Sequence, residues 1–198
     1  MYALPHPLEL DFNPLNLSDE QFYQFCVSNP DFTIERSAKG VVILMAPVGG
    51  DSGSRELGLG GELYLWNKQS QLGRVFSSST LFKLPGGGDR SPDAAWVEEA
   101  RWLALSAEDR RKFPPLAPDF VIELRSSSDS LSALREKMQE YMESGVRLGW
   151  MFNPQQQEVE IYRQGQEKET LSLPAELSGE DVLPGFVLQC EQFTEPQE

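Results

Sequence analysis

Three apolar or nearly apolar runs of five residues stand out along the chain, at Val41–Met45, Phe120–Leu124 and Leu148–Phe152. Runs of this length predict strands, and the last two are apolar enough to be buried on both faces of a sheet. Between those two runs, residues 130–144 carry apolar side chains at helical spacing. Residues 120–152 therefore predict a strand–helix–strand unit, in which the two strands are parallel and the crossover is right-handed.

The rest of the chain predicts a mixture of helices and strands. Ser18 is typical of a helix N-cap, with Gln21 at the capping-box position and Asn29-Pro30 as the stop. The other expected elements are a hairpin of 32–35 and 41–45 with a turn at 37–40, a helix at about 54–71, short strands at 75–77 and 81–84, a strand at 91–97, an insertion at 101–118 with a short helix beginning near Ser106, and an antiparallel pair at 158–163 and 169–173.

The length and this order of elements indicate one α/β domain. A chain of 198 residues is long enough for a sizeable core. We expect a central mixed sheet that contains the parallel unit, helices on its faces, and an amino-terminal hairpin. The domain should occupy residues 18–193, preceded by a loose arm at 1–17 and followed by a tail at 194–198.

Charge and composition narrow the function classes. The net charge of −14 argues against a broad basic face for nucleic acid, so contact with phosphates should need a divalent cation or a local basic groove. No apolar run approaches the roughly 20 residues that span a bilayer, and residues 1–14 do not resemble a signal peptide, so we expect a cytoplasmic protein without membrane contact. The only histidine, His6, lies in the arm, which argues against histidine-based catalysis.

Two acidic residues occur where the predicted strands should be buried. Asp93 follows Pro92 at the start of one strand, and Glu123 lies among the aliphatic residues of Val121–Leu124. Taken singly, the aspartate could be a turn residue and the glutamate could face solvent. Taken together on neighbouring strands, they could hold one hard cation such as Mg²⁺, which prefers carboxylate oxygens and water.

Several ordered motifs give the chain a resemblance to a known family. They are Ser91-Pro-Asp93, Pro118–Leu124, Ser126–Ser130, Lys137, Tyr141, Gly145-Val146 and Trp150, with Glu35 before a turn glycine and Met45-Ala-Pro47 before an arginine-bearing helix upstream. Over roughly residues 18–190 the chain resembles a bacterial family of predicted restriction endonucleases, known as domain of unknown function 820 and also called Uma-type. Each motif is weak alone, and the ordered set is specific.

The resemblance implies a fold, an activity and a set of site residues. The family belongs to the PD-(D/E)XK nucleases, so it implies the restriction-endonuclease-like fold and a DNA endonuclease that uses Mg²⁺ or Mn²⁺. By that resemblance, Asp93 and Glu123 would be metal ligands and Glu35 an accessory acid. Many such nucleases are homodimers, because cutting both strands of a duplex calls for two sites.

The position of the catalytic lysine departs from the superfamily pattern. The usual motif has lysine two residues after the acid, whereas this chain has Arg125 there. Arginine can stabilise phosphate charge but does not deprotonate, so it cannot be a general base. Lys137, on the following helix, is the alternative, and it borders the predicted apolar stripe of that helix. A solvated surface lysine is the competing interpretation, and both basic residues could also face one phosphate.

Three functions remain open from the sequence. The first is a metal-dependent endonuclease that cleaves DNA by attack of metal-activated water. The second is a catalytically degenerate nuclease fold that binds DNA or a protein, which Arg125 and the acidity favour. The third is a metal-dependent hydrolase of a smaller phosphorylated substrate, which also suits the acidity. A fold alone does not choose between them.

Overall fold

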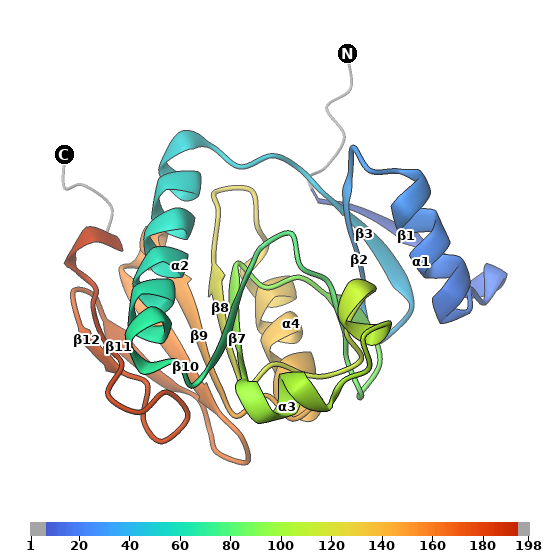
Figure 1. Ribbon diagram of the computed structural model, residues 1–198. Coiled ribbons are helices and arrows are strands. Elements are labelled where there is room, and N and C mark those ends of the chain that lie inside the picture. The colour runs from blue at the N-terminus through green and yellow to red at the C-terminus, as the bar shows by residue number, and fades with distance from the viewer. Residues whose placement is uncertain (1–6, 194–198) are drawn as a thin grey trace.

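The computed structural model describes residues 7–193, and its centre is a six-stranded mixed sheet (Figure 1). The strand order is β11-β10-β9-β8-β7-β4. Their bounds are β4 Gly73–Ser77, β7 Ala94–Glu98, β8 Phe120–Leu124, β9 Leu148–Asn153, β10 Glu158–Arg163 and β11 Glu169–Ser172. Only β8 and β9 pair in parallel, and the other neighbours in this sheet are antiparallel.

The parallel pair is joined by helix α4, Leu131–Glu143, which confirms the predicted strand–helix–strand unit. Ser130 caps this helix by accepting a hydrogen bond from the backbone N–H of Ala133. Every residue of β8 and β9 is buried, as their apolar sequences predict. The crossover brings α4 back over the sheet, where its buried side chains share one core with Val121 of β8 and Met151 of β9.

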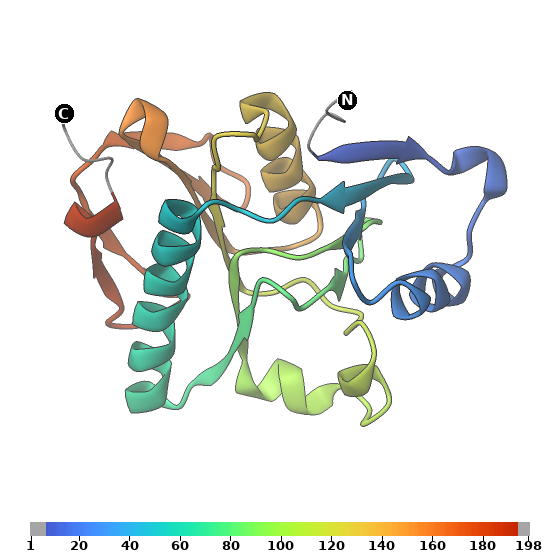
Figure 2. The ribbon, with the colours of Figure 1, turned by 90° about the horizontal axis from the view of Figure 1, so that it is seen from above.

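Different elements cover the two faces of the central sheet (Figure 2). Helix α2, Gly50–Ser70, covers one face together with a small sheet of β12, Glu176–Ser178, and β13, Val187–Gln189. Helix α4 covers the other face with the short helix α3, Glu99–Ala104. Alternation along β8 sends Ile122 towards α2 and Val121 towards α4.

A second sheet contains the predicted hairpin and lies beside the α4 face. Its order is β1-β3-β2-β6-β5, with β1 Leu8–Asp11, β2 Thr33–Arg36, β3 Val41–Met45, β5 Phe82–Lys83 and β6 Asp89–Arg90. Helix α1, Asp19–Ser28, packs on it through Phe22, which contacts Ile34 and Val42 in a separate small core. The capping box of Ser18 and Gln21 is present as predicted.

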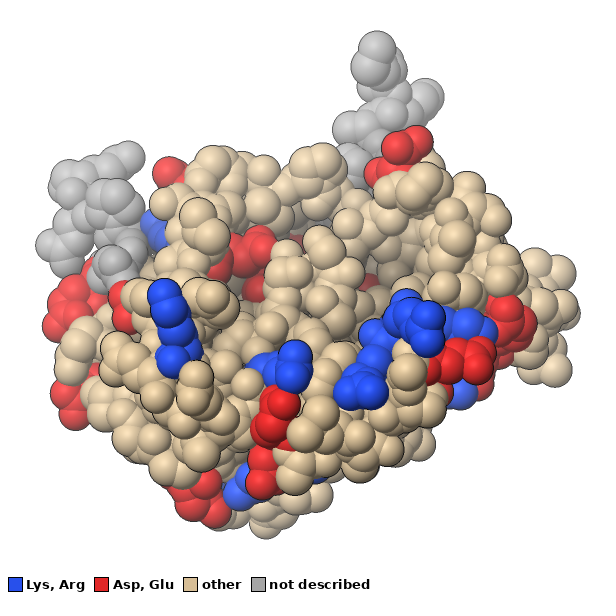
Figure 3. Space-filling model, viewed as in Figure 1, with Lys and Arg blue, Asp and Glu red and all other residues tan. Residues whose placement is uncertain are grey.

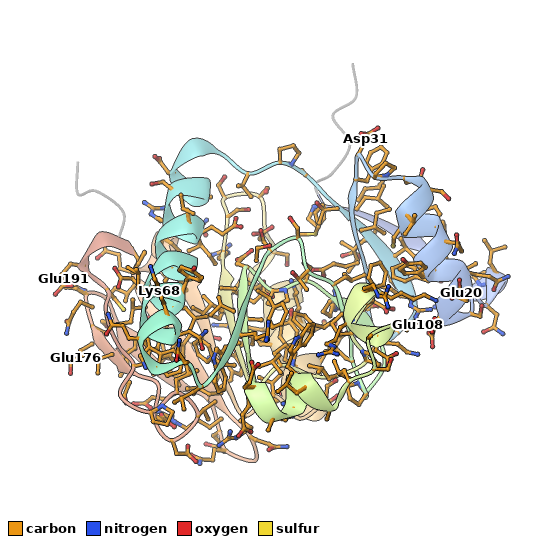
Figure 4. All side chains as sticks on the ribbon, in the orientation of Figure 1. Glu20, Asp31, Lys68, Glu108, Glu176 and Glu191 are labelled. Atoms are coloured by element: carbon orange, nitrogen blue, oxygen red, sulfur yellow. The ribbon has the colours of Figure 1, made fainter. Side chains whose placement is uncertain are left out.

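The insertion between β7 and β8 is tied to α1. Figure 4 shows Glu20 and Glu108 near one another at the same edge of the molecule. Lys112 lies between them, 3.5 Å from the carboxylate of Glu20 and 3.3 Å from that of Glu108. These exposed pairs add little stability, yet they show that the insertion lies against the amino-terminal layer rather than projecting into solvent.

Four predictions of local structure were wrong or incomplete. Residues 8–11 of the expected loose arm form β1, in which Leu8 pairs with Leu44 of β3. Helix α2 begins at Gly50 rather than near Ser54, and the helix of the insertion is 99–104, with only a 3₁₀ turn at Asp109–Arg111. The short strands β12 and β13 were not foreseen. The remaining 3₁₀ turns are Asn13–Leu15, Pro154–Gln156 and Glu191–Phe193.

Two of the predictions fall on parts of the chain outside the described residues. These are the position of His6 in the arm and the tail at 194–198. Within residues 7–193, no helix is both long and apolar enough to cross a membrane.

Candidate functional site

The predicted acidic residues meet where the second sheet abuts the central one. Asp93 directly precedes β7, Glu123 lies on β8, and Glu35 lies on β2 of the second sheet. Ala94 pairs with Ile122, so continuing the antiparallel register by one residue sets Asp93 opposite Glu123, on the face covered by α4. In Figure 3, acidic atoms are visible in a hollow between α2 and the second sheet.

Lys137 enters this cluster from α4, as its place beside the apolar stripe of the helix predicts. Its Nζ lies 2.7 Å from Glu123 Oε1 and 2.9 Å from Glu35 Oε1, and it donates a hydrogen bond to the carbonyl of Ser91 at 3.0 Å. Each of these three charged side chains is less than one tenth exposed. Lys137 is therefore a buried cation shared by two carboxylates from different sheets, and not a solvated surface lysine.

The two carboxylates keep Lys137 charged. Burial alone would lower the pKa of this ammonium, but the negative charges of Glu123 and Glu35 outweigh burial and raise its pKa above the ordinary value. An ammonium with a raised pKa holds its proton at neutral pH. Lys137 in this state can offset negative charge and donate hydrogen bonds, but it cannot accept a proton as a general base.

Glu35 is held by two cations. Its Oε1 accepts from Lys137 and from the backbone N–H of Ser91 at 3.0 Å, and its Oε2 accepts from Arg90 at 3.0 Å. Burial raises the pKa of Glu35, but the charges of Lys137 and Arg90 more than offset this and leave it lowered. Arg90 is itself buried and also binds Glu140 of α4 at 2.7 Å. Glu35 is thus a fixed anion that anchors both cations.

Asp93 and Glu123 are in the opposite electrostatic situation. Burial, followed by the charge of Glu123, raises the pKa of Asp93 well above its usual value, and the charge of Glu56 on α2 adds to this effect. Burial also raises the pKa of Glu123, although the charge of Lys137 opposes it. Two adjacent acids that disfavour their own ionisation form the kind of site that a bound cation would stabilise.

Each of these two acids uses one oxygen within the protein. Asp93 Oδ2 accepts the backbone N–H of Leu124 at 2.6 Å, and Glu123 Oε1 accepts both Lys137 and the hydroxyl of Tyr141, the latter at 2.9 Å. Within residues 7–193, Asp93 Oδ1 and Glu123 Oε2 receive no hydrogen bond. Asp93 is also only half-buried. One oxygen of each acid is therefore open to a ligand from the solvent side.

Asp93 and Glu123 together form a two-carboxylate donor set, which suits a hard divalent cation that keeps most of its water. Among the described residues, no group of three or more His, Cys, Asp or Glu side chains is arranged to hold a metal. Mg²⁺ commonly binds proteins through one or two carboxylates and keeps several waters. The free oxygens of Asp93 and Glu123 match that requirement.

Arg125 does not join the cluster. Its guanidinium donates to the carbonyl of Asp129 at 3.3 Å and to the side chain of Asn153 at 3.2 Å. These bonds hold the side chain against the loop that follows β8. The structure therefore brings together Glu35, Asp93, Glu123 and Lys137, while Arg125 lies outside the group.

Three residues near the site were missed from the sequence or interpreted differently. Tyr141 is one of the motif residues of the resemblance, but its contact was not foreseen: its ring is fully buried and its hydroxyl binds Glu123. Its position four residues after Lys137, on the same helix face, was the available signal. Arg90, which binds Glu35, was also missed, although it lies only three residues before Asp93 in sequence. Glu56 gave no signal, because only the packing of α2 on the central sheet brings its charge near Asp93.

Comparisons with known proteins identify a family and a similar fold. Residues 19–191 match the model of the Uma2 family, described as "Putative restriction endonuclease". The fold is similar to the crystal structure of "a putative nuclease belonging to DUF820 from Anabaena variabilis ATCC 29413", with a TM-score of 0.69 and 18% identity over 81% of this chain and 89% of that one. At this identity the likeness concerns the fold alone. No curated protein matches the chain.

Proposed function

The chain belongs to the Uma2 family, and from that premise we propose that it is a metal-dependent endonuclease that hydrolyses phosphodiester bonds of DNA. The observation that carries the proposal is the pairing of Asp93 with Glu123, each with one free oxygen, beside the buried ammonium of Lys137. A metal-dependent nuclease uses a bound divalent cation, and a fixed positive charge next to the attacked phosphate can stabilise the charge that develops there. This cluster offers places for both.

Asp93 and Glu123 would hold Mg²⁺, or Mn²⁺ in its place. When bound, the cation would polarise a phosphoryl oxygen and make water more acidic near neutral pH. The protein fixes both ligands before any cation arrives. The N–H of Leu124 holds the aspartate, and the hydroxyl of Tyr141 together with Lys137 holds the glutamate.

Lys137 would stabilise charge rather than accept a proton. The raised pKa keeps its ammonium charged, so it can offset the negative charge that develops on the attacked phosphate. Glu35 and the carbonyl of Ser91 orient the ammonium, and Arg90 in turn fixes Glu35. In this proposal Glu35 is a positioning residue, because its oxygens are taken up by protein donors.

The distribution of cations supports a limited surface for nucleic acid. Most arginine and lysine side chains of residues 7–193 are engaged by carboxylates, such as Arg74 by Glu99 at 2.8 Å. Within that part of the chain, Arg111 and Arg125 donate hydrogen bonds to carbonyl or amide oxygens and are not at ion-pair distance from a carboxylate. Figure 3 shows basic side chains on the same face as the acidic hollow. Unneutralised cations are the ones that can contact phosphates in an otherwise acidic protein.

A cleavage assay on purified protein tests the proposal. Supercoiled plasmid and short duplexes are incubated with Mg²⁺, Mn²⁺ or EDTA, and nicked and linear products are followed over time. We expect cleavage with either cation and none with EDTA. Asp93→Asn should abolish it, whereas Asp31→Asn, the same change at an exposed aspartate in the turn between α1 and β2 (Figure 4), should leave it intact.

Two further variants separate the roles of the basic residues. Lys137→Ala should remove cleavage, and Arg125→Ala should mainly weaken binding of the duplex. The opposite ranking would return the catalytic role to Arg125. A parent protein that cuts no nucleic acid with either cation, but still retards duplex DNA in a gel, would replace the proposal with the degenerate binding protein.

A further inference from the structure

The outward side of α2 exposes large apolar side chains on an otherwise charged protein. Leu57 is 77% exposed, Tyr64 56% and Leu65 52%. The opposite side of the same helix buries Leu59 and Leu63 against the central sheet. The helix therefore has two apolar faces, and only one of them is covered.

Little charge interrupts this surface. It consists of Leu57, Gly61, Tyr64, Leu65, Lys68 and Leu72, here called the α2 outer face. All except Leu72, which follows just after the end of the helix, lie on one side of α2 because of their helical spacing. Lys68 is its one charged member, and Figure 4 shows that side chain on α2. Figure 3 shows a basic side chain there with mostly uncharged atoms around it.

The spacing of the outer-face residues along the sequence is the same in both directions. Spacings of four and then three residues lead from Leu57 through Gly61 to Tyr64, and spacings of three and then four lead from Leu65 through Lys68 to Leu72. An antiparallel copy of α2 centred between Tyr64 and Leu65 would bring Leu57 to the second copy's carboxyl end of α2, which Leu72 closely follows. The same alignment would set Tyr64 against Leu65, and Gly61 against Lys68.

We infer that the α2 outer face packs against the same face of a second copy of this chain, with the two helices antiparallel. A two-fold interface must be self-complementary, and this alignment meets that condition without placing like charges together. Gly61 is suited to receive the long side chain of Lys68, because a Cβ built on Gly61 meets no atom within 4 Å. Glu62, beside Gly61, would supply a carboxylate for the incoming ammonium.

Charge favours a second copy on this face over other faces. Each chain carries a net charge of −14, so two copies repel one another wherever acidic surfaces meet. The six residues of the outer face include one cation and no acid, and the bordering Glu62 would lie near the second copy's Lys68, so close approach costs little there. A nucleic acid would instead need a strongly basic surface, which this face does not offer.

The size of the face predicts a weak dimer. Residues 57–72 span about 22 Å along the helix, and a strip of one helix width covers a few hundred Å² per partner. Stable dimers bury about 800 Å² per partner. We therefore expect a concentration-dependent dimer with a dissociation constant of roughly 1 to 100 µM. The inference holds whether or not the chain cleaves nucleic acid.

Sedimentation velocity without nucleic acid or metal tests the inference. The parent protein, run from about 1 to 200 µM, should shift from monomer towards dimer. Leu65→Glu should weaken the dimer at least tenfold. Leu103→Glu is the matched control, because Leu103 is also an exposed leucine at the surface, at 55% exposure on α3, and receives the same added charge. Thermal unfolding should show both variants folded.

A charge exchange tests the alignment and does not depend on the behaviour of Leu65→Glu. Lys68→Glu should weaken the dimer, and adding Glu62→Lys to it should restore association, since the pair would then carry exchanged charges. A parent that stays monomeric across the range overturns the inference. So does equal weakening by Leu103→Glu, or a Lys68→Glu defect that Glu62→Lys leaves unchanged.

Discussion

Replacing Lys137 with methionine tests whether the acidic cluster is held together by one buried cation. Methionine keeps the unbranched apolar stem and removes the ammonium. That ammonium binds Glu123 at 2.7 Å and Glu35 at 2.9 Å, and all three side chains are buried. Without it, Glu123 keeps the hydroxyl of Tyr141 as its one side-chain donor among residues 7–193, and Glu35 keeps Arg90.

The size of the effect follows from burial. Removing one partner of a buried ion pair costs about 3–5 kcal/mol, because the other charge is left without compensation. For a domain of this length, each kcal/mol lowers the melting temperature by about 2–4 °C. We therefore expect Lys137→Met to melt about 6–20 °C below the parent at neutral pH in the absence of divalent cations.

Thermal and urea unfolding measure this difference, and Lys39→Met is the matched control. Lys39 also pairs with a glutamate of α4, Glu136, at 2.8 Å, but both side chains are more than 60% exposed. Its replacement should change the free energy of unfolding by less than about 1 kcal/mol. If Lys137→Met is as stable as Lys39→Met, the acidic cluster does not depend on a buried ammonium, and the proposed role of Lys137 loses its physical basis.

Three further predictions concern single side chains. Asp93→Asn should be at least as stable as the parent in chemical denaturation, because the raised pKa of Asp93 shows that its charge opposes folding at neutral pH, while plasmid cleavage should be lost. Tyr141→Phe should lower the free energy of unfolding by about 1–3 kcal/mol, since Glu123 loses a buried donor, with reduced cleavage on the same preparations. Burial would raise the pKa of Glu160, but hydrogen bonds from Arg135 and Lys168 lower it to about 2. The stability that Glu160 contributes is therefore present above about pH 4.5 and lost as the pH falls towards 2, and unfolding of Glu160→Gln across that range should show a flatter pH dependence.

The elements that sequence predicted well are those with strong local signals. Residues 120–152 alternate between apolar runs and a helical stripe, and both signals come from the packing of the same central sheet. Ser18 and Gln21 form the capping-box hydrogen bonds at the start of α1, so the local sequence alone indicates where this helix begins. The elements that were missed depend on distant partners. The strand at Leu8–Asp11 exists because β3 offers an edge, and glycines obscured the start of α2.

In the candidate site, too, features with a local signal were predicted, whereas features that depend on distant residues were not. The place of Lys137 at the border of an apolar helix stripe was enough to direct it towards Glu123. Its contact with Glu35 joins residues 102 positions apart, and it arises only because two sheets meet there. Arg125 occupies the motif position by sequence, yet Asp129 and Asn153 draw its guanidinium away. The position of a residue in sequence determines which element carries its side chain. The hydrogen-bond partners of that side chain determine where its charged group lies.

The cluster of Glu35, Arg90 and Lys137 ties the second sheet to helix α4, and Lys137 extends it to Glu123 of the central sheet, which bears on how related sequences are interpreted. Natural selection would retain these residues for folding alone, even in a descendant that had lost the ability to cut. Retention of Glu35, Arg90 or Lys137 across a family therefore does not distinguish active members from inactive ones. Under the proposed function Asp93 would distinguish them, because burial and the charge of Glu123 raise its pKa and make its charge costly to the fold, whereas a bound cation would stabilise that charge.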